Sequence, residues 1–317
     1  MTERPVTVIR SFLNADLPRL KDLWIENWST MGPPPMVSEP QFEQAVLSRT
    51  FFRAQQLLVA EREGDVVGWL HFCEFPESSV RFGIPAICLG QNAEVTDARE
   101  LIEEATSRVS ASGGRTVEAG VIRDQSFGYA GLEPIGHGVG IIDADIRVRQ
   151  ALQAAGFQAD RVALAMTASV PGFRPPVSRE SLQFRRSSHV EMVSFNFQDP
   201  RAAAAMSHLD VETHRLLDRA GQVLAEVNFW LSDPEAQVMN PSLMIADLGE
   251  AQQRGKLEPS EVYLLGASIQ AAARRNILSV ETVVDEDQSQ LIAGLASLQF
   301  QPTGRGTNWK LALGDRR

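Results

Sequence analysis

The feature that most constrains the fold is an internal duplication, because two parts of the chain repeat one order of sequence patterns at a spacing of about 150 residues. Each part opens with a short apolar strand pattern and a helix pattern. Each part closes with a helix pattern that ends at an aromatic residue, Phe157 in the first part and Phe300 in the second, before a last strand. We therefore predict two copies of one folding module. The opening segments are 6–10 and 182–185, and the closing segments are 150–166 and 294–313.

Composition places the chain among soluble globular proteins. Its 317 residues suffice for two domains, each with a core of its own. The content is 44% apolar and 22% charged, and no apolar run approaches the roughly 18 to 20 residues of a membrane helix. The first five residues lack the basic and apolar pattern of an export signal. We therefore expect a cytoplasmic protein without a membrane partner.

The net charge and the numbers of cysteine and histidine residues exclude some classes of function. The formal net charge of −10 excludes nucleic acid as an expected partner, because phosphate binding needs a basic face. The two cysteines, Cys73 and Cys88, lie in apolar strand patterns and are expected to be buried free thiols. The five histidines are scattered, so we expect no metal site.

Hydrophobic periodicity predicts the elements of the first half. Two strand patterns flank Gly64-Asp65, which supplies the tight turn of a hairpin. Gly113-Gly114 ends a helix whose apolar residues recur every three or four positions. The predicted strands are 6–10, 56–60, 66–72, 84–89, 116–122 and 161–166, and the predicted helices are 17–24, 39–52, 97–110 and 145–155.

A proline-rich segment separates the two halves, because three prolines within residues 170–176 favour an extended spacer. We predict an N-terminal domain over 1–169, a linker over 170–180 and a C-terminal domain over 181–317. The strands predicted for the second half are 182–185, 223–230, 243–248, 279–284 and 309–313, and the helices are 201–217, 261–275 and 288–297.

This element order and the two closing segments resemble the GNAT superfamily of N-acetyltransferases. The duplication resembles the tandem GNAT proteins of the mycothiol synthase type, and residues 126–145 resemble a loop that some GNAT proteins carry before their last helix. The resemblance covers nearly the whole chain and rests on order and spacing. It implies a mixed α/β fold with two tandem GNAT-like domains, each a twisted mixed sheet flanked by helices.

The resemblance also implies a donor and an acceptor. In GNAT proteins the sheet splays between its fourth and fifth strands, and acetyl-CoA lies in the cleft. Backbone amides at the start of the next helix hold its diphosphate, because unpaired amides and the helix dipole attract anions and glycine lets the backbone approach them. The implied acceptor is a small-molecule or peptide amine.

The family's diphosphate loop has the pattern Gln/Arg-x-x-Gly-x-Gly/Ala. In the first half only Ala98 fits it, while Glu94 and Asp97 bring negative charge that also serves to cap a helix. In the second half residues 252–257 match two of the three specified positions, about four residues out of register, so a solvent-facing loop is the alternative. If one half binds the donor, we expect it to be the second, with Ala246, Leu248, Arg254, Gly255 and Lys256 as the cofactor-binding residues.

Acyl transfer to an amine requires a base for the amine and often an acid for the leaving thiolate. In many GNAT enzymes the acid is a tyrosine in the last helix, where this sequence has Leu152 and Leu295, and neither side chain can donate a proton. The two tyrosines of the chain, Tyr129 and Tyr263, lie outside those helices.

Four residues are candidate bases. Glu74 ends a strand of the first half, and Glu226 lies in the corresponding strand of the second half. We predict a catalytic role for these two carboxylates. His71 and His137 are the other titratable candidates, for which a structural role is the alternative.

Two functions therefore stay open. The first is an N-acetyltransferase that uses acetyl-CoA. The second is a non-catalytic GNAT-fold scaffold or ligand-binding protein, a pseudoenzyme that has lost the diphosphate loop and the acid. An exposed sheet edge would permit pairing, so both a monomer and a homodimer are consistent with the sequence. The acceptor depends on loops around 31–36 and 127–140, and the sequence does not name it.

Overall fold

The computed structural model describes residues 6–314. Its first module confirms the predicted hairpin and the predicted central helix, which packs Leu101, Ala105 and Val109 against the sheet. The predicted helix over 39–52 is instead a short α-helix that continues as the π-helical turn Glu43–Leu47. The elements are β1 (Thr7–Ser11), α1 (Leu17–Ser29), α2 (Glu39–Phe42), β2 (Leu57–Arg62), β3 (Asp65–Phe75), β4 (Ser78–Leu89), α3 (Val95–Ala111), β5 (Thr116–Ala119), β6 (Ile141–Ile142), α4 (Ile146–Ala154) and β7 (Gln158–Ser169).

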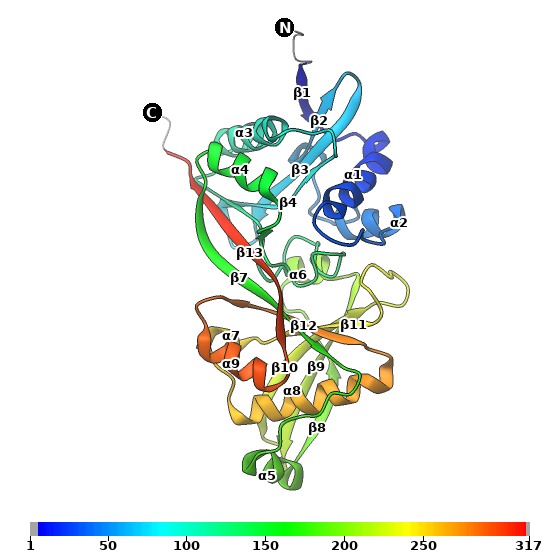
Figure 1. Cartoon of the computed structure of the whole chain (residues 1–317), viewed down its shortest axis with the longest axis vertical. Helices are drawn as coiled ribbons and strands as arrows, with labels where there is room; N and C mark the ends of the chain where they lie inside the picture. The colour runs from blue at the N-terminus through cyan, green and yellow to red at the C-terminus, as the bar shows by residue number, and fades with distance from the viewer. Residues whose placement is uncertain (1–5, 315–317) are drawn as a thin grey trace.

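The second module lies below the first in Figure 1 and repeats its α/β organisation. Its helix α8 packs the buried Leu264, Leu265 and Ile269 into the core of this module. The elements are α5 (Arg179–Ser187), β8 (Ser188–Ser194), α6 (Pro200–Ala205), β9 (Leu209–Asp218), β10 (Val223–Ser232), β11 (Leu243–Asp247), α7 (Glu250–Arg254), α8 (Pro259–Ala272), β12 (Ser279–Asp285), α9 (Ser289–Ser297) and β13 (Gln301–Ala312).

Two predicted elements of the second half are wrong. The strand predicted over 182–185 is part of helix α5, whose start is capped by Ser178 Oγ, which accepts a hydrogen bond from Ser181 N at 3.1 Å. The helix predicted over 201–217 ends at Ala205, and the chain then forms strand β9. Leu209 and Val211 are buried while Asp210 between them is exposed, which is the period of a strand and not of a helix.

The two modules share one mixed sheet, because their last strands are exchanged. The strand order is β1-β2-β3-β4-β5-β13-β7-β12-β11-β10-β9-β8, with β6 paired to β13. The C-terminal end of β13 pairs with β5 of the first module, and the C-terminal part of β7 pairs with β12 of the second. Figure 1 shows β7 and β13 running side by side through both modules. Because the sheet continues from one module into the other, the predicted domain boundaries at residues 169 and 181 do not separate two independent sheets, and they remain a prediction.

Each module contains two parallel strands that pair briefly and then part. In the first module β4 pairs with β5 as far as Ile84 and Ala119, and from there to Leu89 β4 pairs with β3 but no longer with β5. In the second module β11 pairs with β12 as far as Ile245 and Glu281. We call these places the first parting and the second parting. At a parting each strand lacks the neighbouring strand on one side, so both partings are candidate ligand sites.

Candidate functional site

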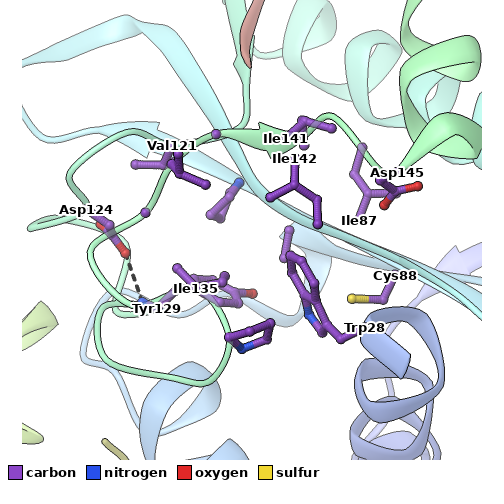
Figure 2. Close-up of a pocket in the computed structure, with 16 residues that line it drawn as sticks. Trp28, Ile87, Cys88, Val121, Asp124, Tyr129, Ile135, Ile141, Ile142 and Asp145 are labelled. Atoms are coloured by element: carbon purple, nitrogen blue, oxygen red, sulfur yellow. Dashed lines mark hydrogen bonds between the residues drawn. The ribbon is translucent and has the colours of Figure 1, made fainter. Parts of the chain in front are cut away.

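A cavity of about 50 Å³ lies at the first parting, between β4 and the segment that follows β5. We call it the inner cavity. Figure 2 shows Asp124 at one end of it and Asp145 at the other, with Cys88 beside Trp28. Most of the remaining lining is apolar. The lining residues are Trp28, Val121, Asp124, Tyr129, Asp145 and the segments 85–88, 134–135 and 138–142.

The edge of β4 at the inner cavity offers a free backbone donor. Gly90 N donates to Val67 O of β3 at 2.8 Å, and Leu89 N donates in the opposite direction to Asn27 Oδ1 of α1 at 3.1 Å. Because amide directions alternate along a strand, the Ile87 N–H points to the same side as that of Leu89. An extended ligand chain could pair with this edge of β4.

Tyr129 brings a hydroxyl group to the inner cavity. Its Oη lies 2.9 Å from Nδ1 of the buried His71 on β3. Burial, with a smaller contribution from Arg201, lowers the pKa of His71 to about 3, so this imidazole is neutral at neutral pH. With its proton on Nδ1, His71 donates to Tyr129 Oη and leaves the tyrosine O–H free. Burial also raises the pKa of Tyr129 well above its usual value, so the hydroxyl keeps its proton.

The turn that carries Tyr129 is organised around the buried Asp124. Its Oδ1 accepts hydrogen bonds from Ser126 N at 2.9 Å and Phe127 N at 2.8 Å. Its Oδ2 accepts one from Tyr129 N at 2.9 Å, which Figure 2 shows as a dashed line. Burial raises the pKa of Asp124, and the backbone donors oppose that shift. The carboxylate thus fixes the backbone of Tyr129 at the cavity wall.

A pocket of about 470 Å³ adjoins the inner cavity, with which it shares Trp28, Pro134, Ile135, Val139 and Ile142. We call it the outer pocket. Its volume lies within the range of roughly 300 to 1,000 Å³ that is usual for small-molecule sites. Both modules contribute to its walls. The residues that complete the lining are Ala165, Glu281 and the segments 31–33, 143–144 and 303–305.

Glu281 is the carboxylate that the second module contributes to the outer pocket. It lies on β12, between Ile245 of β11 and Thr167 of β7. Its Oε1 accepts a hydrogen bond from His137 N at 3.0 Å. A Cβ atom at Gly136 would lie 2.2 Å from Oε1, so only glycine allows this approach. Burial raises the pKa of Glu281 to about 7, which the hydrogen bond from His137 partly opposes.

The loop between β4 and α3 presents carbonyl groups to a cation. Arg147 of α4 donates to Leu89 O at 3.2 Å and, through Nη1, to Gly90 O at 2.8 Å. At the start of α3 the buried Asp97 accepts a hydrogen bond from Glu94 N at 2.7 Å. This carboxylate compensates the helix dipole that would otherwise attract a phosphate. Arg147 is therefore the positively charged group beside this loop.

The chain's own side chains fill the second parting. Thr282 Oγ1 donates to Ala246 O at 2.7 Å. From the segment after β5, Gln125 Nε2 donates to Asp247 Oδ2 at 2.7 Å, and Arg123 forms an ion pair with Asp285 at 3.3 Å. These contacts use the groups that a ligand at the second parting would need.

The predicted catalytic carboxylates lie outside both spaces. Glu74 is exposed near the end of β3, where Arg201 Nη2 donates to its backbone oxygen at 3.4 Å. Glu226 is exposed on β10 and forms an ion pair with Arg215 at 2.7 Å. The structure does not bring the two together, and their catalytic roles stay predictions.

The predicted cofactor-binding residues are split between a core and a helix end. The side chains of Ala246 and Leu248 are buried in the core of the second module. Arg254, Gly255 and Lys256 lie where α7 ends, with Gly255 at φ 69°. The amides of Gly255 and Lys256 donate to Gln252 O and Ala251 O, both at 3.3 Å, so they are already used within the helix end. A diphosphate site at these residues remains a prediction.

Tyr129 and Glu281 are absent from the predicted set of site residues. Tyr129 lies in a glycine-rich segment, and the family expectation directed attention to the last helices instead. The sequence could have indicated Glu281, since it is a carboxylate in the middle of a valine-rich strand, between Val280 and Val283. Charged residues in such a strand are rare unless they have a partner or a function.

Within residues 6–314 the His, Cys, Asp and Glu side chains form no group that could hold a metal ion. None of the helices in that range is both long and apolar enough to cross a membrane. Cys73 and Cys88 are buried free thiols, as predicted.

Comparisons with known proteins rest on structure, since no family model and no curated protein matches the sequence. A tandem GNAT protein from the clavulanic acid biosynthesis pathway matches with a TM-score of 0.67 at 14% identity, over 98% of this chain and 100% of the other. A GCN5-related N-acetyltransferase from Sphaerobacter thermophilus matches with a TM-score of 0.62 at 10% identity, over 96% and 95%. Saccharomyces cerevisiae N-myristoyltransferase, with bound myristoyl-CoA and inhibitors, matches with a TM-score of 0.53 at 9% identity, over 98% and 82%.

Proposed function

The chain has the fold of a tandem GNAT protein, and from this premise we propose that it is an acyltransferase whose reaction centre is the first parting. The donor is a CoA thioester, with acetyl-CoA as the first candidate, and the acceptor is an amine. The observation that carries this proposal is the inner cavity, where the free edge of β4 and the protonated Tyr129 hydroxyl face one space. Fold alone names no substrate, so the proposal depends on this arrangement.

The donor's position follows from the sizes of the spaces. The inner cavity, of about 50 Å³, is far smaller than a typical ligand pocket and has room for the acyl end alone. We place the arm of the donor along the edge of β4, with the Ile87 N–H as its backbone partner. Arg147, beside the loop from Leu89 to Ala93, is the cation that we assign to the diphosphate.

The chemistry assigns one role to Tyr129. The neutral amine nitrogen attacks the thioester carbonyl carbon, a C–N bond forms, and the C–S bond then breaks. The leaving sulfur takes a proton from Tyr129, and the proton that the new amide nitrogen loses restores the tyrosine hydroxyl. A positioned acid of this kind contributes a factor of about 10² to 10⁴ in rate.

A non-catalytic scaffold or ligand-binding protein is the second candidate. It is favoured by the small inner cavity, the filled second parting and the buried Asp97 at the start of α3. A protein of this kind would use the outer pocket for a ligand that it does not transform.

Turnover separates the two candidates. Purified protein is mixed with acetyl-CoA and a panel of amines, and the release of free CoA thiol is followed by a colorimetric reagent. We expect amine-dependent release, and a loss of about 100-fold in kcat for Tyr129→Phe. Tyr263→Phe is the matched control, because Tyr263 lies on α8 beside Phe184, and it should keep the wild-type rate. No amine-dependent release from folded protein would contradict the enzyme and favour the scaffold.

A further inference from the structure

We propose that the outer pocket binds the acceptor as a positively charged amine and that Glu281, from the second module, takes the proton that this amine must lose. This inference rests on the proposed function and deepens it. Under this inference both modules contribute residues to the site. The inner cavity belongs to the first module, and the Glu281 carboxylate belongs to β12 of the second.

Of the two carboxylates that line the outer pocket, only Asp143 has a positively charged partner among the described residues. Asp143 lies in its wall and forms an ion pair with Arg305, which also lines the pocket. Glu281, by contrast, forms no ion pair with any side chain in the described range 6–314. A carboxylate without a cationic partner at the wall of a pocket is a site for an ammonium group.

The aromatic wall of the outer pocket also suits a cation. Trp28 lines both the outer pocket and the inner cavity, so its ring lies at their junction. The face of an indole ring attracts ammonium groups, with an effect that grows when water is excluded. Apolar residues such as Ile135 and Val139 complete the junction and suit a hydrocarbon body attached to the ammonium.

The surroundings of Glu281 make it able to exchange a proton near neutral pH. Burial raises its pKa to about 7. From the loop packed against it, His137 contributes a backbone amide, and its buried ring faces Trp230 with a centroid separation of 4.4 Å. The strand neighbours Ile245 and Thr167 carry no charge. Asp143 and Arg305 are the charged groups that share the pocket with Glu281.

The proton balance is complete without a further reactant. The bound ammonium gives one proton to the Glu281 carboxylate and becomes the neutral amine, which attacks the thioester as described above. The second proton of the nitrogen replaces the one that Tyr129 gives to the sulfur. Glu281 then releases its proton to solvent through the outer pocket.

A binding experiment tests this inference without turnover. The probe is 2-phenylethylamine, which stays protonated between pH 6 and pH 8, and its neutral analogue is 2-phenylethanol. Calorimetry on the donor-free, full-length protein should show that the amine binds up to about tenfold more tightly at pH 8 than at pH 6, because a carboxyl with a pKa of about 7 is then mostly ionised. The alcohol should show no such dependence.

Variants complete the test. Glu281→Gln keeps an oxygen for the His137 amide and should abolish the pH dependence of amine binding, while Glu191→Gln, exposed on the edge strand β8, should keep it. Equal amine affinity at both pH values in the wild type would overturn the inference even if Glu281→Gln failed to fold. Acyl transfer by the wild type with an unchanged rate and pH profile in Glu281→Gln would also overturn it and would leave the proposed function intact.

Discussion

At the scale of single residues, Asp124 illustrates how a buried charge serves the site by holding a backbone in place. Its two oxygens accept three backbone amides, and the last of these belongs to Tyr129. A carboxylate can accept all of these bonds, whereas an amide side chain has one acceptor oxygen and would turn its NH₂ group toward a donor. The position of the Tyr129 hydroxyl therefore depends on a residue that need not touch the substrate.

We predict that Asp124→Asn lowers the free energy of unfolding by about 1 to 3 kcal/mol, the cost of leaving a buried donor without an acceptor. Denaturant unfolding followed by circular dichroism measures it. Asp218→Asn is the matched control, because Asp218 Oδ1 accepts the Ala220 and Gln222 amides in an exposed turn, and it should change stability by less than about 0.5 kcal/mol. Equal effects of the two substitutions would contradict the role given to Asp124.

At the scale of elements, local sequence patterns correctly predicted the helices and turns that are stabilised by interactions between residues close in the sequence. The hairpin of β2 and β3 follows from Gly64-Asp65, and α3 follows from its apolar stripe. The predicted helix over 201–217 is wrong beyond Ala205, because Leu209 and Val211 of β9 are buried by pairing with β10 and by packing in a cluster that includes Ala130 of the first module. Local propensity is a weak guide where tertiary packing decides.

The exchange of β13 leads to a prediction about Trp309. This residue belongs to the last strand of the second half, but its buried side chain packs in the core of the first module. We expect Trp309→Ala to lower the unfolding free energy by about 3 to 5 kcal/mol, because it leaves a cavity there. Met192→Ala on the edge strand β8 should change it by less than about 0.5 kcal/mol, since Met192 is 57% exposed. A small effect at Trp309, measured by denaturant unfolding, would argue against the exchange.

At the scale of the whole molecule, the duplication predicted two modules and their partings but not how they cooperate. Pairing between β7 and β13 spans more than a hundred residues of sequence, and a pattern in either strand does not reveal the register of the other. For the same reason the sequence pointed to Glu74 and Glu226, which are exposed on strands β3 and β10, and not to the pair of Tyr129 and Glu281. Only the assembled sheet brings residues of both halves to one pocket.

The central claim is that the first parting is the donor site, and a crystal structure of the protein with bound CoA tests it most directly. We predict one CoA molecule per chain, its arm beside residues 85–89 of β4 and its diphosphate near Arg147, with the second parting still closed by Gln125 and Arg123. Calorimetry on the same preparation should give a stoichiometry of one. CoA bound instead beside Arg254, Gly255 and Lys256 at the end of α7 would contradict the account.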